Sequence, residues 1–251
     1  DVTVISGGFL GALFAGFLAG YLVLALEKIT EKMPDSMDGL RPMLIYPVVG
    51  LLLISVIMFA INPFFSWLNQ LLADALNSLS GANSILLGVI LGGMMSIDMG
   101  GPFNKAAYVF GTASLAYQTE AGYMIMAAVM VGGMVPPIAI AISSWVFKNK
   151  FTDNDRKTAP VNAIMGLCFI SEAAIPYAAG DPLHVIPSCV IGSAVAGALS
   201  MAFKCTLMAP HGGIFVFPVV GHALMYIVAL LIGAIVGAIM LGLLRKPVES
   251  K

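Results

Sequence analysis

Charged side chains are scarce in this sequence. Only 10% of the 251 residues are charged, whereas 59% are hydrophobic, and the mean hydropathy is +0.97. Soluble domains carry about 25% charged residues, so the composition excludes an ordinary soluble domain and predicts an integral membrane protein. The net charge of −1 gives no electrostatic reason to expect a nucleic-acid partner.

Cysteines and nucleotide-binding motifs are also few or missing. Cys168, Cys189 and Cys205 have neither C-x-x-C nor metal-ligand spacing, and we expect them to be packing residues. The sequence contains neither GxxxxGK(S/T) nor GxGxxG, so ATP-driven pumping within this chain is unsupported, and no cofactor or metal is expected. An apolar run starts soon after Asp1 with no basic region before it, so we expect part of a longer protein rather than a signal peptide.

Three hydrophilic stretches interrupt the apolar sequence: residues 27–42, residues 148–160 and the C-terminal tail. They contain every Lys and Arg of the chain except Lys105 and Lys204. Because basic loops tend to stay on the cytoplasmic side of a membrane, both loops and the C-terminus are predicted to be cytoplasmic.

The apolar segments are of two kinds. Those of about 20 residues or more, enough to cross a membrane, are Val4–Leu26, Met43–Leu68, Tyr123–Phe147, Val185–Leu207 and Ile214–Leu244. Shorter or interrupted ones are Ser84–Ile97, Ala106–Tyr117 and Val161–Ile170. If all basic loops lie on one side, the short segments must enter the membrane and return. The sequence therefore predicts an all-α, polytopic membrane helix bundle with re-entrant or broken helices, an arrangement typical of a transporter site at mid-membrane.

The segment Ser171–Pro182, SEAAIPYAAGDP, places two carboxylates and two prolines within apolar sequence. A charge at the bilayer centre costs about 2.5–3.5 kcal/mol, and proline frees backbone groups that need partners inside the protein. Segments of this kind typically line a polar cavity. Glu172 is therefore a candidate solute ligand, or it accepts hydrogen bonds from its own loop. Asp181 could contact the solute, or cap the following helix and pair with His184.

Two further breaks carry polar side chains. In Asp98–Ala107, DMGGPFNKAA, the Gly-Gly-Pro sequence forces a turn. Asp98 could bind a solute or neutralise Lys105, and Asn104 suits a hydroxylated solute. In the APHGGI turn, His211 could bind a solute, gate a cavity or only satisfy a carbonyl. The predicted binding residues are Asp98, Asn104, Glu172, Asp181 and His211.

These three motifs, in this order, resemble those of the fructose-type enzyme IIC, the membrane permease component of the phosphoenolpyruvate-dependent sugar phosphotransferase system. The resemblance runs from about Gly7 to Lys246. Ser171-Glu172-Ala173 stands where Thr-Glu-Gly is more usual, a departure that bears on which sugar is bound. Members of the family also carry further apolar helices before the position of Val4.

The resemblance implies scaffold-like helices at about residues 1–80 and an elevator-type, substrate-binding transport region at 81–251. It also implies a homodimer in the bacterial cytoplasmic membrane. The implied substrate is extracellular fructose or a related sugar, with a polyol or a mannosyl-glycerate-like conjugate as alternatives. Uptake would be coupled to phosphorylation by a phosphocysteine on a separate IIB domain or subunit, so no cysteine of this chain is expected to be phosphorylated.

Site roles follow from the same resemblance. Glu172 matches the sugar-binding glutamate of the family and His211 a histidine of the companion turn, whereas Asp98 and Asn104 match polar positions of the first motif. Glu172 is also the catalytic candidate, because it could orient the reacting hydroxyl or act as its base. Orientation is favoured, since no second residue in the motif is placed to tune its pKa.

Two other functions remain open from the residues alone. A proton-coupled sugar symporter would use Asp98, Glu172 and His211 as proton carriers, and a sugar sensor would bind without transporting. An adjoining cysteine-bearing IIB-like domain favours the phosphotransferase. Uptake driven by a pH step, without any phosphate donor, favours the symporter.

Overall fold

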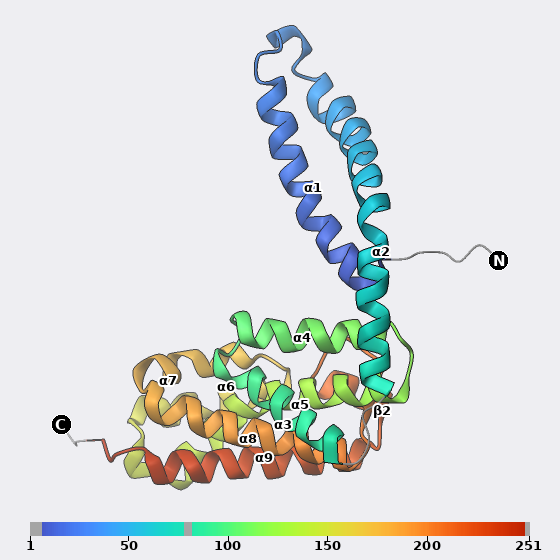
Figure 1. Cartoon of the computed structure of the whole chain (residues 1–251). Coiled ribbons are helices and arrows are strands. Elements are labelled where there is room, and N and C mark those ends of the chain that lie inside the picture. The colour runs from blue at the N-terminus through green and yellow to red at the C-terminus, as the bar shows by residue number, and fades with distance from the viewer. Residues whose placement is uncertain (1–6, 78–81, 249–251) are drawn as a thin grey trace. The chain divides into compact units, whose positions relative to one another are not determined.

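The computed structural model describes residues 7–77 and 82–248. The chain divides into two compact units, residues 1–75 and residues 76–251 (Figure 1). Within the described residues, the helices long and apolar enough to cross a membrane are Gly11–Thr30, Arg41–Leu68, Glu120–Val146, Pro182–Ala202 and Ala223–Leu244. Each of the expected long apolar segments therefore overlaps one of these helices, with residues 4–6 of the first segment outside the described part, and the prediction of an α-helical membrane bundle is confirmed.

The first unit is a pair of helices. Helix α1 (Gly8–Thr30) is followed by η1 (Asp35–Met37), by the π-helix η2 (Arg41–Val49) and by α2 (Gly50–Asn77). The two long helices are almost unburied, with side chains such as Phe17 and Phe59 exposed by 67% and 84%. Such apolar faces suit contact with lipid chains or with other protein.

The second unit is built around α5 (Glu120–Val146). The remaining elements of this unit are α3 (Ala82–Ile97), α4 (Pro102–Leu115), η3 (Lys148–Lys150), α6 (Asp153–Leu167), η4 (Ser171–Ala174), α7 (Ile175–Gly180), α8 (Pro182–Ala202), β1 (Thr206–Leu207), η5 (Ile214–Val219), β2 (Val220–Gly221) and α9 (Ala223–Leu244). Helices α3, α4, α6, α8 and α9 all pack against α5, and its apolar stretch is 94% buried. Helix α5 is thus the core of the unit.

Small residues permit the close packing of α3, α8 and α9. A β-carbon on Gly88 of α3 would lie 2.5 Å from the Gly197 carbonyl oxygen of α8. One on Gly192 of α8 would lie 2.6 Å from the Gly233 carbonyl oxygen of α9. Any larger side chain at these positions would push the helices apart.

The short apolar segments form two hairpins, α3–α4 and α6–α7, whose turns lie at the middle of α5. Helix α3 has 16 residues, about 24 Å at 1.5 Å per residue, which is less than the hydrocarbon thickness of about 30 Å. A β-carbon on Gly133, midway along α5, would lie 3.0 Å from Met95 Cε near the end of α3. It would lie 2.6 Å from the Phe169 ring at the end of α6. This geometry is the one expected of re-entrant hairpins.

The segment between α8 and α9 differs from the expectation. The expected spans Val185–Leu207 and Ile214–Leu244 are shortened, because α8 ends at Ala202 and α9 begins at Ala223. Between them β1 pairs antiparallel with β2, and η5 precedes β2. Lys204 and His222 have positive φ angles of 53° and 57°, which end one helix and precede the other.

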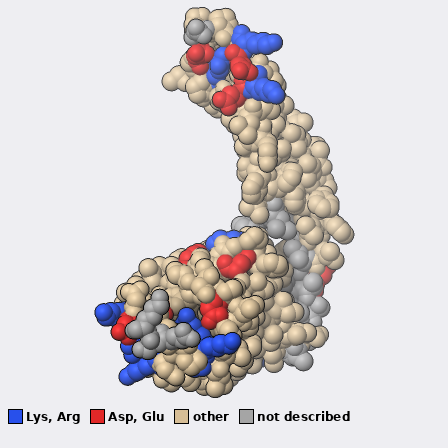
Figure 2. Space-filling view, turned by 90° about the vertical axis from the view of Figure 1, so that its left-hand side faces the viewer, with Lys and Arg blue, Asp and Glu red and all other residues tan. Residues whose placement is uncertain are grey.

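The 148–150 turn and the C-terminal segment lie at the same end of the second unit. The Lys150 ammonium donates to the Arg245 carbonyl, and the Val248 amide donates to the Asn149 carbonyl at 3.0 Å. The Arg245 guanidinium lies 4.6 Å from the centre of the Phe151 ring. Figure 2 shows Lys and Arg side chains spaced around this end of the unit, which is called the basic end below.

Candidate functional site

Two prolines within the central helix anchor the second motif. Because proline has no N–H, the Pro136–Pro137 pair leaves the carbonyls of Gly132 and Gly133 without their usual helical donors. Ser193 Oγ of α8 donates to the Gly132 carbonyl at 2.8 Å. Ser171 Oγ, at the start of η4, donates to the Gly133 carbonyl at 2.6 Å, and both serines are buried. The freed carbonyls therefore fix Ser171 at the midpoint of α5.

Glu172 lies against the turn of the first motif. A β-carbon on Gly100 would lie 2.9 Å from Glu172 Oε1, and Gly100 has a φ of +123°, which L side chains rarely adopt. The glycine therefore lets the turn approach the carboxylate closely. The Glu172 side chain is exposed within the described chain, so its oxygens can accept hydrogen bonds from a ligand.

Asp98 and Asn104 hold the α3–α4 turn together. Asp98 Oδ2 accepts from the Phe103 amide at 2.7 Å, and Oδ1 accepts from the Asn104 amide at 2.9 Å. These are orphan donors of the first turn of α4, so the carboxylate caps that helix. The buried Asn104 side chain donates to the Met95 carbonyl at 2.7 Å.

The alternative role considered for Asp98, neutralising Lys105, is wrong. The ion pairs among the described residues do not include these two side chains. The physical reason is that both Asp98 oxygens are taken up by backbone amides of α4. Lys105 is instead exposed on α4.

The third motif packs against the end of α6. The Tyr108 hydroxyl of α4 donates to the Pro210 carbonyl at 2.6 Å. The His211 ring lies 5.8 Å, centre to centre, from the Phe169 ring. His211 Nδ1 donates to the Gly212 carbonyl at 2.6 Å, which leaves Nε2 as a hydrogen-bond acceptor in the neutral ring. The side chain is exposed, so this acceptor can reach a ligand.

The structure thus brings the three motifs together at the middle of α5. Asp98 and Asn104 fix the α3–α4 turn, and Gly100 of this turn lies against Glu172. The turn of His211 contacts α4 and Phe169 at the end of α6. Asp98 and Asn104 hold the α3–α4 turn through hydrogen bonds, whereas Glu172 and His211 present hydrogen-bond acceptors at the surface. The arrangement can bind a neutral, hydroxyl-rich solute.

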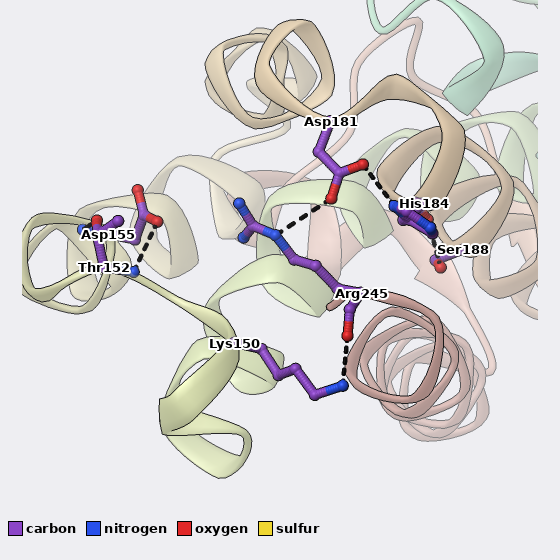
Figure 3. Close-up of polar contacts among 7 residues, drawn as sticks. All are labelled: Lys150, Thr152, Asp155, Asp181, His184, Ser188 and Arg245. Atoms are coloured by element: carbon purple, nitrogen blue, oxygen red, sulfur yellow. Dashed lines mark hydrogen bonds and ion pairs between the residues drawn. The ribbon is translucent and has the colours of Figure 1, made fainter. Parts of the chain in front are cut away.

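Asp181 belongs to a different cluster, at the basic end (Figure 3). Its Oδ1 lies 2.6 Å from His184 Nδ1, which confirms the predicted pair, and its Oδ2 lies 3.3 Å from Arg245 Nε. The predicted side-chain cap of α8 is wrong, because these ionic contacts draw the carboxylate away from the helix amides. Sequence analysis missed Arg245, since a basic residue near a chain end is usually solvated.

The cysteines show no sign of reactivity. All three are free thiols, and Cys189 and Cys205 are buried. Burial raises the pKa of the Cys205 thiol to about 11, so it is a neutral thiol at physiological pH. Among the described residues, no group of three or more His, Cys, Asp or Glu side chains could hold a metal ion.

Comparison with known proteins decides the family. The model of the family described as "Phosphotransferase system, EIIC" matches residues 2–192. This chain belongs to that family. The resemblance predicted from the three motifs is therefore confirmed.

Several EIIC relatives are similar over most of this chain. The fructose permease IIC component of Bacillus amyloliquefaciens is 51% identical over 251 residues, covering 99% of this chain and 81% of the relative. The PTS system fructose-specific EIIABC component of Bacillus subtilis is 50% identical over 99% of this chain, which spans only 39% of that protein. The fructose-specific EIIB'BC component of Escherichia coli is 44% identical over 86% of this chain and 38% of its own length. No solved structure matches the chain.

Proposed function

We propose that this chain is the sugar-translocating part of a fructose-type phosphotransferase permease. It binds extracellular fructose or a related sugar and presents it to a phosphorylated IIB partner. The proposal depends on one observation above all: the three family motifs meet at the middle of α5, with Glu172 and His211 exposed. The designations EIIABC and EIIB'BC of two relatives support a partner of the IIB type.

Sugar binding follows from the acceptors on these turns. The Glu172 carboxylate can accept from two sugar hydroxyls at once, and His211 Nε2 can accept from a third. Hydrogen bonds to a charged group are worth about 1.5–3 kcal/mol each, so Glu172 supplies the larger share of binding energy. Asp98 and Asn104 act by holding the turn against which Glu172 lies.

Phosphorylation makes uptake irreversible. The phosphorus–sulfur bond of the partner's phosphocysteine breaks, a phosphorus–oxygen bond to the sugar forms, and the hydroxyl proton balances the charge of the departing thiolate. Glu172 accepts the hydrogen bond of the reacting hydroxyl and so orients its oxygen. The product gains about 1.5–2 negative charges, and an anion of this kind cannot leave through a path lined by acceptors.

During translocation the second unit moves as one rigid piece. This unit contains all three motifs. Hydrogen bonds join α3 to α8, α8 and η4 to α5, and α4 to the turn of the third motif at Pro210. In our proposal it carries the sugar across while the first unit stays in place, and the exposed apolar faces of α1 and α2 contribute to a homodimer. The basic end, residues 27–42 and the C-terminus face the cytoplasm, where the IIB partner acts.

The test uses the full-length permease in vesicles with its phosphorylated IIB partner. We expect radiolabelled fructose to be converted to its phosphate, and Glu172→Gln to abolish this. Glu120→Gln is the matched control, because Glu120 is an exposed carboxylate of the same unit outside the motifs. Unmodified fructose and related sugars would contradict the proposal. Uptake driven by a pH step without a phosphate donor would instead indicate a symporter.

A further inference from the structure

A basic cavity lies at the basic end of the second unit, away from the three motifs. It has a volume of about 580 Å³ and is formed where α5 ends, η3 turns and α6 begins. Its lining residues are Ser144, Trp145, Lys148, Asp153, Arg156 and Lys157. None of these residues takes part in the contacts that join the sugar-binding motifs.

Positive charge dominates this cavity. It is lined by three cations and one carboxylate, and that carboxylate, Asp153, is ion-paired with Arg156. Lys148 and Lys157 are exposed, and neither has an ion pair among the described residues. The nearby Asp155 is engaged in the Thr152 capping box. Two lysine ammonium groups are therefore available to an anion.

The cavity lies where the surface changes from apolar to charged. At the end of α5, Trp145 and Val146 are exposed by 45% and 66%. Helix α6 is polar from Asp153 to Thr158, and then exposes Val161 by 53% and Ile164 by 61%. Both helices thus cross from hydrocarbon to headgroup level at this cavity, and tryptophan and lysine are the residues that favour this level.

We propose that the cavity binds the phosphate headgroup of an anionic phospholipid. Lys148 and Lys157 bind the phosphate, while the Trp145 ring lies beside the glycerol and the upper acyl chain. Basic pockets between helices on the cytoplasmic side of a membrane favour acidic headgroups in this way. A soluble phosphate ester would use the same two lysines, but it has no acyl chain for Trp145 and the adjoining apolar surface.

The test measures retained lipid. The full chain is purified in micelles containing equal phosphatidylglycerol and phosphatidylcholine, and bound lipid is counted by native mass spectrometry. We expect a preference for phosphatidylglycerol that falls about fivefold for each lysine removed, the equivalent of about 1 kcal/mol per charge. The double variant Lys148→Gln/Lys157→Gln should thus lose most of the preference for phosphatidylglycerol. The double variant Lys28→Gln/Lys32→Gln removes the same charge from the first unit and should keep this preference.

A further arm distinguishes lipid from soluble phosphate. Trp145→Ala should weaken phosphatidylglycerol retention and leave the weak binding of glycerol phosphate unchanged. Equal loss of lipid preference in both lysine variants would overturn the proposal, because it would indicate diffuse attraction. If glycerol phosphate displaced phosphatidylglycerol and bound as tightly as the lipid, the cavity would be a site for soluble phosphate instead. Weaker binding of phosphorylated IIB with unchanged lipid retention would indicate a protein-docking surface.

Discussion

Ser171 Oγ donates a 2.6 Å hydrogen bond to the Gly133 carbonyl, the acceptor that Pro137 leaves without a helical amide. The start of η4 therefore supplies the donor that this carbonyl of α5 lacks. In the hydrocarbon region an unpaired carbonyl is costly, so a broken helix is tolerated only where another group replaces the lost donor. Here the replacement donor is the residue directly before Glu172, so the proline pair in α5 is coupled to the position of Glu172, the proposed sugar ligand.

Ser171→Ala should lower both stability and sugar affinity. The change leaves the Gly133 carbonyl unpaired at a cost of about 1–3 kcal/mol, and it frees η4 to shift. Ser171→Thr keeps the hydroxyl and should retain affinity. Thermal unfolding and fructose binding measure the two effects.

The matched control for this prediction is Ser193→Ala. It removes the equivalent hydrogen bond to the Gly132 carbonyl from α8 and also the contact with Ser96 Oγ, so we expect at least as large a loss of stability with fructose affinity kept. Equal loss of affinity in both variants would show that Ser171 has no special role in placing Glu172.

Gly100→Ala should displace the Glu172 carboxylate. A φ of +123° is strained for alanine, at a cost of about 1–3 kcal/mol, and the new β-carbon would meet Glu172 Oε1 at 2.9 Å. We expect fructose binding to be lost and the unfolding temperature to fall. Gly20→Ala, where nothing lies within 4 Å of the added carbon, should keep fructose binding and should not lower the unfolding temperature. Full binding by the Gly100 variant would mean that the sugar does not use Glu172 in this position.

Substitution of Asp98 should mainly lower the free energy of unfolding. Asp98→Ala removes the acceptors for two amides of α4 and should cost about 0.5–2 kcal/mol, as helix caps do. Asp98→Asn keeps one acceptor oxygen and should cost less, with fructose binding largely retained. Measuring unfolding and binding together separates the roles. Lost binding with unchanged unfolding in the Asn variant would place Asp98 in direct contact with the sugar.

The sequence predicts the interrupted segments and their polar turns, but not the contacts between these segments. Paired broken segments and their polar turns follow from local rules, because proline, glycine and isolated charges within apolar sequence act at the position where they occur. That Ser171 meets Gly133, or that Gly100 lies on Glu172, depends on the register between segments distant in the chain. Periodicity carries no information on that register when every face is apolar.

The same reasoning explains the wrong predictions. Hydropathy alone predicts that one membrane span ends at Leu207 and that the next begins at Ile214. Residues 203–222 are mostly apolar, but three of them, Lys204, Gly213 and His222, adopt positive φ angles, and four pair as short strands. Apolar composition predicts burial or lipid contact, whereas helix continuity also requires compatible backbone angles. Proximity in sequence suggests Lys105 as a partner of Asp98, but the carboxylate instead accepts hydrogen bonds from two amides of α4.

The Asp181–Arg245 pair should stabilise the basic end of the second unit. The two side chains are only 21% and 16% exposed, so the effect of removing one should exceed the 0–1 kcal/mol typical of surface pairs, at about 1–3 kcal/mol. A full 3–5 kcal/mol, as for a deeply buried pair, is not expected. Arg245→Gln also removes the cation–π contact with Phe151 and should therefore destabilise more than Asp181→Asn. A double-mutant cycle in thermal unfolding isolates the coupling between the charges. If the two effects simply add, the ion pair contributes nothing, and the C-terminal end of α9 is held by the packing of Arg245 on Phe151 and by the hydrogen bonds from Lys150 and Val248.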